Sequence, residues 1–209
     1  MHRTSARLAA WALLAGSVVA TTGYLTAFLA NGNSDARFAG STWTPLYTIA
    51  LFGDVLVLLG LPCLLHAHGE RSRTLTLIGY AGVLVPLVVL NIGEGSVEAF
   101  MKPYLVKHGR PLSHDLAGLT AFEAPAVAVM LVGMICLGVA VFRARLLPRW
   151  VGALFIVTPL LGAAGLSGAV SLVPDYLLFV SLFAVGVHTL RSEPSIEPAE
   201  ATAALQAQA

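Results

Sequence analysis

Two glutamates and an asparagine lie close together in an apolar part of the chain, in the run Asn91-Ile-Gly-Glu94-Gly-Ser-Val-Glu98. Their spacing places all three side chains on one face of a helix. Two carboxylates one turn apart repel each other when both are ionised, so we expect the pair to share a proton, bind a cation or recruit a base. In the alternative interpretation, Glu98 pairs with Lys102 and Glu94 is solvated.

A third carboxylate, Asp54, lies inside another apolar segment that begins near Pro45. An ionisable group deep in a membrane costs at least ~2.5 to 3.5 kcal/mol and therefore needs an explanation. The structural explanation is a hydrogen bond to Thr48 or Tyr47. The functional explanation is a hypothetical catalytic acid cluster formed by Asp54, Glu94 and Glu98.

Glu123 has two interpretations as well. The run Thr120-Ala-Phe-Glu123 has the spacing of a helix capping box, with Pro125 in the first turn of the helix that follows. The topology derived below also places Glu123 at the level of the other acids. We therefore group it with neighbouring polar and aromatic side chains as candidate ligand-binding residues: Asn91, Glu123, Tyr47, Trp43, Tyr104 and Phe122.

Composition indicates the elements that position these residues. The chain has 209 residues, of which 57% are hydrophobic and 11% charged, whereas soluble domains carry roughly 25% charged residues. The apolar residues form runs near the ~20 residues that cross a bilayer as a helix. A formal net charge of +1 gives no basic surface for nucleic acid. The sequence thus predicts an all-α, polytopic transmembrane bundle in the plasma membrane.

Six helices are expected, in one domain over residues 1–190. Counting Lys and Arg in the short loops places both termini in the cytoplasm, with eight basic residues inside and four outside. Residues 191–209 lack apolar periodicity and are expected to form a disordered cytoplasmic tail. The loop of residues 101–119 is expected outside. The helices are predicted at about 8–30, 45–65, 75–100, 120–142, 150–172 and 174–190.

Small residues indicate where helices touch, because lipid provides no hydrophobic force between helices. Gly16 and Ala20 in the first helix, and Gly162, Gly165 and neighbouring small residues in the fifth, predict close contacts between these two helices. Prolines inside apolar helices, such as Pro86, are expected to kink them and to leave room for a cavity.

The remaining motifs give weaker evidence of function. His66 and His68 form an HxH without an evident third ligand, and Cys63 and Cys136 lie in apolar segments and form no CxxC motif. We expect no metal site and no cofactor, since no nucleotide-binding or hydrolase motif is present. The expected partners are membrane lipids and an apolar small molecule. Oligomeric state is not indicated.

Two stretches carry a family resemblance. Residues 97–103 (VEAFMKP) and 138–150 (GVAVFRARLLPRW) resemble an uncharacterised family of actinobacterial-type multi-pass membrane proteins of about this length. The resemblance implies about six helices and no particular activity.

Three functions remain open from the sequence. The first is binding of a lipid or small apolar ligand in an acidic cavity in the outer half of the bundle. The second is an intramembrane enzyme that uses a protonated carboxylic acid on an isoprenoid or lipid, by analogy with small membrane terpene cyclases. The third is a proton- or cation-coupled transporter.

Overall fold

The computed structural model describes residues 3–32, 34–67, 73–110, 112, 117–145, 147–164, 170 and 172–192. These residues form helices and turns, and no strand occurs among them. The long helices are α1 (Arg3–Asn31), α2 (Trp43–Gly60), α4 (Arg73–Pro86), α6 (Ala117–Ala144), α7 (Arg149–Ala163) and α8 (Val173–Ser192). The short elements are the 3-10 helix η1 (Asp35–Ala39), α3 (Pro62–Ala67), the π-helices η3 (Leu87–Glu94) and η4 (Val97–Met101), and α5 (Lys102–Lys107).

Five of the described helical segments are long and apolar enough to cross a membrane, which supports the predicted all-helical membrane protein. The sixth apolar helix, α7, has 15 residues. At about 1.5 Å per residue it is shorter than the ~30 Å hydrocarbon core. The five candidate spans are Thr4–Asn31, Trp43–Leu65, Arg73–Lys107, Glu123–Ala144 and Val173–Ser192.

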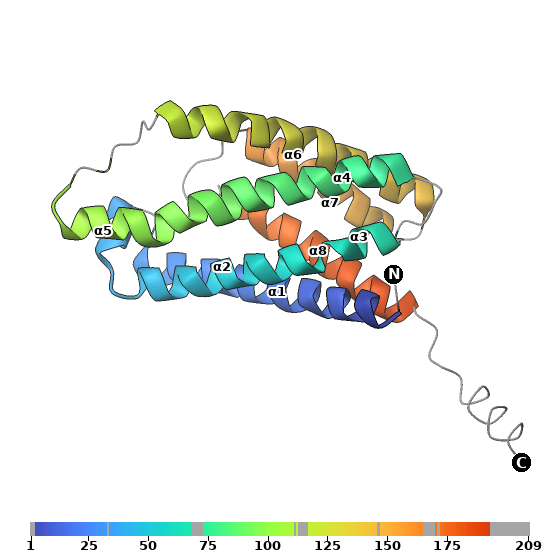
Figure 1. Cartoon of the computed structure of the whole chain (residues 1–209), viewed down its shortest axis with the longest axis horizontal. Helices are drawn as coiled ribbons and strands as arrows, with labels where there is room; N and C mark the ends of the chain where they lie inside the picture. The colour runs from blue at the N-terminus through green and yellow to red at the C-terminus, as the bar shows by residue number, and fades with distance from the viewer. Residues whose placement is uncertain are drawn as a thin grey trace, which may run out of the picture.

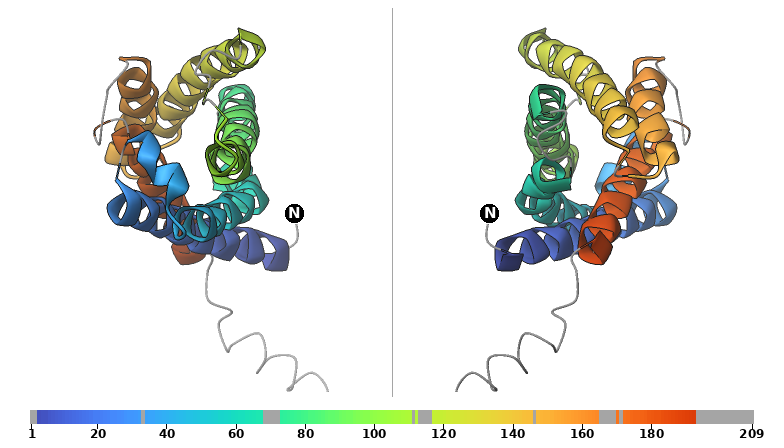
Figure 2. Two further views of the ribbon diagram at one scale, coloured as in Figure 1. Left: turned by 90° about the vertical axis from the view of Figure 1, so that its left-hand side faces the viewer. Right: turned by 90° about the vertical axis from the view of Figure 1, so that its right-hand side faces the viewer.

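The helices are arranged as a ring when the molecule is viewed along its long axis (Figure 2). Neighbours in the ring are α1 with α2, α4 with α6, α6 with α7, α7 with α8, and α8 with α1. The start of α1 and the end of α8 lie at one end of the bundle, which we call the terminal end (Figure 1). The opposite end carries α5 and η1, and we call it the α5 end.

Glycines allow the tightest helix contacts, as expected for helices in lipid. A Cβ atom on Gly16 would lie 2.5 Å from Val57 N, and one on Gly23 would lie 2.7 Å from Ala50 N, so α1 packs backbone to backbone on α2. Gly82 of α4 and Gly133 of α6 meet in the same way.

The predicted pairing of the first and fifth helices is wrong for the described residues. Gly16 faces α2, and α7 packs against α6 and α8 instead. Sequence shows that a glycine face is suited to close contact, but it does not show which helix fills it. Gly165 lies outside the described residues.

One continuous helical segment runs from Arg73 to Lys107. Its hydrogen-bonding pattern changes from α to π directly after Pro86, which has no N–H to continue the α-helical pattern. Because the segment continues to Lys107, it extends beyond Phe100, where the helix was predicted to end, and the first part of the expected outer loop is helical. Long π-helical segments are rare, and π-helical geometry often occurs at functional sites.

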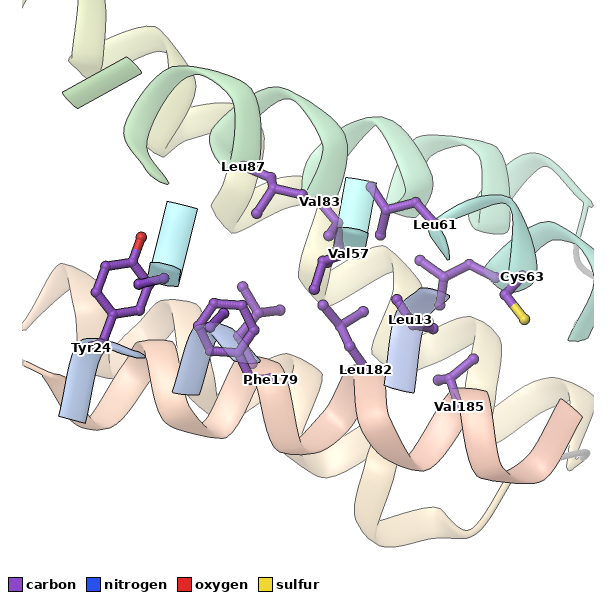
Figure 3. Close-up of a cluster of buried hydrophobic side chains, with 14 of the residues drawn as sticks. Leu13, Tyr24, Val57, Leu61, Cys63, Val83, Leu87, Phe179, Leu182 and Val185 are labelled. Atoms are coloured by element: carbon purple, nitrogen blue, oxygen red, sulfur yellow. The ribbon is translucent and has the colours of Figure 1, made fainter. Parts of the chain in front are cut away.

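Buried apolar side chains fill the ring from its middle toward the terminal end (Figure 3). Leu13 of α1, Val57 of α2, Val83 of α4 and Leu182 of α8 meet there and are at most 1% exposed. Cys63 is also fully buried, in agreement with a packing role. The interior of this half of the bundle is therefore mostly apolar, and the buried hydroxyls of Ser17 and Thr189 donate to carbonyl oxygens of their own helices.

We expect the contact between Gly82 and Gly133 to tolerate no side chain. Gly82→Ala should lower the melting temperature in detergent, since forcing a methyl group into a filled contact costs about 1 to 3 kcal/mol. Gly162→Ala is the matched control, because its Cβ would meet no atom closer than 3.9 Å among those found. Equal melting temperatures for the two variants would contradict the close contact of α4 with α6.

Candidate functional site

A polar cavity of about 310 Å³ opens inside the ring at the α5 end. Its walls come from α1, η1, α2, the π-helical part of the third span, and the start of α8. Seven of the lining residues are charged, amide-bearing or phenolic. The lining residues are Tyr24, Phe28, Arg37, Tyr47, Leu90, Asn91, Glu94, Gly95, Glu98, Leu172 and Asp175.

The π-helices supply the acidic wall of this cavity. Asn91, Glu94 and Glu98 all line it, as does Gly95. Each turn of a π-helix contains more residues than an α-helical turn, because its hydrogen bonds join residues five apart. The three polar side chains predicted to share a helix face all line one cavity, although the backbone that carries them is π-helical and not the α-helix that the spacing assumed.

Glu98 is the most highly connected acid of the site. Its carboxylate accepts a hydrogen bond from Arg37 Nη2 at 3.3 Å and also pairs with Lys102 Nζ. The side chain of Glu98 is 12% exposed. Its backbone carbonyl oxygen accepts a hydrogen bond from the indole N–H of Trp43 at 2.9 Å. The predicted pairing with Lys102 is therefore formed, and Arg37 adds a second cation from η1.

Aromatic rings surround Arg37. The guanidinium carbon lies 4.5 Å from the ring centre of Phe38, 5.2 Å from that of Trp43 and 5.6 Å from that of Phe28. Such cation–π contacts are worth about 0.5 to 2 kcal/mol each, with the larger values for desolvated groups. Arg37 therefore fastens η1 to α1, α2 and the π-helical wall.

Asp54 lies behind the cavity wall. It is fully buried, and its Oδ2 accepts a hydrogen bond of 2.5 Å from the hydroxyl of Tyr24, whereas Oδ1 has no hydrogen-bond partner among the described residues. The ring of Tyr24 lines the cavity and packs edge to face on Tyr47, with ring centres 5.0 Å apart. The partner expected from the sequence, Thr48 or Tyr47, is thus replaced by Tyr24 from α1.

A second, apolar pocket of about 140 Å³ adjoins the polar cavity. Three residues line both spaces: Leu90, Asn91 and Asp175. We call the two spaces the polar cavity and the inner pocket. The other residues of the inner pocket are Val83, Pro86, Leu87, Met130, Met134, Thr158, Gly162, Pro174 and Leu178.

The remaining candidates lie around these spaces. Trp43 is fully buried and supports the wall through its hydrogen bond to Glu98, while Tyr104 is 61% exposed on α5. Glu123 is half-buried and lies within electrostatic range of Glu94. Because α6 begins at Ala117, Thr120 lies inside the helix and the expected capping box is wrong. The side chain of Phe122 lies outside the described residues.

Three residues of the site were not identified from the sequence: Tyr24, Arg37 and Asp175. Tyr24 is one aromatic among many apolar residues, and Arg37 was counted as a loop charge that sets orientation. Asp175 follows Pro174 at the start of a helix, where an acid is also favoured by the helix dipole. The one sequence signal that could have identified Asp175 is its position next to an apolar segment.

Comparison of the chain with protein-family models, with curated proteins and with solved structures finds no match.

We expect the bond between Tyr24 and Asp54 to stabilise the fold. Tyr24→Phe leaves the buried carboxyl without its partner, which costs about 1 to 3 kcal/mol, and should lower the melting temperature in detergent. Replacing both groups with apolar ones, in Tyr24→Phe/Asp54→Leu, should recover part of that loss. Tyr104→Phe is the control and should have no effect. A Tyr24→Phe variant as stable as the parent would contradict the role of this bond.

Proposed function

We propose that this chain is a six-helix protein of the plasma membrane, with both termini in the cytoplasm, that binds a small amphiphilic molecule between its helices. In this arrangement α7 completes the ring as the sixth span, and the α5 end faces outward. The positions of the two ends of the chain support an even number of crossings, since α1 begins and α8 ends at the same end of the bundle (Figure 1).

The observation that carries the proposal is the junction of a polar and an apolar space inside the ring. The polar cavity of about 310 Å³ and the inner pocket of about 140 Å³ meet at Leu90, Asn91 and Asp175. A ligand occupying both would place a polar end near the α5 end and an apolar end between α4, α6 and α8. This division matches an amphiphile better than a wholly apolar molecule.

The sizes of the two spaces favour a small ligand over a long-chain lipid. Ligand pockets commonly measure ~300 to 1,000 Å³, so the polar cavity is at the lower end of the range. An apolar cavity of ~150 Å³ accommodates benzene, which is close to the volume of the inner pocket. A single ring, or an aliphatic group of similar size, therefore fits there.

Binding is better supported than the two alternatives. Transport needs a path to the terminal end, whereas the interior there is filled by buried apolar side chains such as Leu13 and Leu182 (Figure 3). The acid-catalysed enzyme needs a carboxylic acid that faces its substrate. Of the three acids predicted for this role, Asp54 lies behind Tyr24 and Glu98 is held by Arg37 and Lys102, so Glu94 alone faces the cavity without an ion pair to a described residue.

The test uses 2-phenylethanol, a neutral amphiphile with one ring. We expect it to raise the melting temperature of the purified protein, because a ligand that binds the folded state stabilises it. Leu90→Trp should abolish this shift, since the larger side chain fills the junction of the two spaces. Val88→Trp, on an exposed position of the same helix, should retain it. An equal shift in all three proteins, or none, would refute the proposal.

A further inference from the structure

We propose, on the basis of the amphiphile-binding function, that the ligand carries an ammonium group on its polar end and a hydrogen-bonding substituent on its apolar ring. Its ammonium group is received by Asp175 and Glu94, and its ring by the inner pocket beside Thr158. The chemical class is a small arylalkylamine with a hydroxylated ring.

The polar cavity is lined by more acidic than basic side chains. Four charged side chains line it, one basic and three acidic: Arg37, and Glu94, Glu98 and Asp175. Glu98 is already neutralised by Arg37 and Lys102. Neither Glu94 nor Asp175 forms an ion pair with a described residue. Arg37 and Lys102 carry two positive charges against the three carboxylates, so one negative charge is left for a cationic ligand to balance.

Aromatic side chains line the cavity together with these acids. Tyr24, Phe28 and Tyr47 line the same cavity as Glu94 and Asp175. Aromatic faces attract cations, as the contact of Arg37 with Phe28 already shows in this protein. Acids and aromatic rings together are the usual surroundings of a bound organic ammonium group, whereas an inorganic cation prefers oxygen ligands alone.

The inner pocket contains a hydrogen-bonding group of its own, apart from the acids. Thr158 lines this pocket and is 3% exposed, yet its hydroxyl has no hydrogen-bond partner among the described residues. Buried hydroxyls in a helix can donate to the carbonyl four residues earlier. Ser17 and Thr189 do so, at 2.7 and 3.0 Å. An unpaired buried hydroxyl is costly, and a hydrogen-bonding ligand would remove that cost.

The carboxylates of the polar cavity and the hydroxyl of Thr158 are placed so that one molecule could contact both. Asp175 lines both spaces, and Thr158 lines the inner pocket that Asp175 borders. The helix dipole accounts for an acid in the first turn of α8, but it does not account for Glu94 in the middle of a membrane span or for the unpaired hydroxyl of Thr158. A ligand with an ammonium group and a polar ring substituent would supply a partner for Asp175, Glu94 and Thr158.

The test for the ammonium group compares phenethylamine with 2-phenylethanol, which share the ring and the linker. Dissociation constants are taken from melting shifts of the full-length protein. The amine should bind about tenfold or more tightly, as expected for one charge-assisted hydrogen bond. Asp175→Asn should reduce amine binding to the level of the alcohol and leave the alcohol unchanged. Asp35→Asn, on the exposed surface of η1, should preserve the preference.

Tyramine, which adds a ring hydroxyl to phenethylamine, tests the inner pocket. It should bind about threefold to tenfold more tightly than phenethylamine, and Thr158→Val should remove this gain without affecting phenethylamine. Equal binding of tyramine and phenethylamine by the parent would refute the role of Thr158.

The outcomes separate this inference from the proposed function. If the alcohol binds and the amine binds no more tightly, the ammonium class is wrong while the amphiphile cavity stands. If neither compound binds, both proposals fail. An amine preference that survives Asp175→Asn and is lost in Glu94→Gln would move the ammonium group to Glu94 and overturn the assignment to Asp175.

Discussion

Polar groups inside a membrane bundle must find their partners within the protein, because lipid offers none. At the α5 end this requirement centres on Glu98. Its carboxylate holds Arg37 and Lys102, and its carbonyl oxygen holds the indole of Trp43. Through these bonds one residue of the π-helical wall joins η1 and α2 to the third span. The polar cavity exists because this network supports its rim.

The apolar contacts complete the frame. Backbone contact at glycine holds α1 against α2, and α4 against α6. These two tight pairs lie on different parts of the ring (Figure 2). Residues of α1 and α2 line the polar cavity, and residues of α4 and α6 line the inner pocket. Asn91 and Glu94, on the π-helical stretch that follows Pro86, line the polar cavity. Close packing and an open interior are therefore compatible, since the small residues are confined to particular helix pairs.

The sequence was sufficient for the helical class and for the shared position of Asn91, Glu94 and Glu98, but Asp54, which was expected in the same cluster, does not line the cavity. Runs of apolar residues predicted the helices, and spacing alone placed Asn91, Glu94 and Glu98 on a common face. Spacing could not reveal the partners, because these come from distant segments: Tyr24 for Asp54, and Arg37 for Glu98. The π-helical geometry was also unpredictable, since it depends on hydrogen bonds that the residue pattern does not encode.

The central claim is that the wall carrying Asn91 faces a water-accessible space between the helices. The most direct measurement is the reaction of Asn91→Cys with a cationic methanethiosulfonate reagent in nanodiscs, with Cys63 and Cys136 replaced by alanine. A charged reagent does not enter lipid, so Phe52→Cys, at a position 66% exposed on the outside of α2, should stay unmodified. We predict modification of Asn91→Cys in the folded protein. Complete protection of Asn91→Cys, with modification after unfolding, would contradict the account.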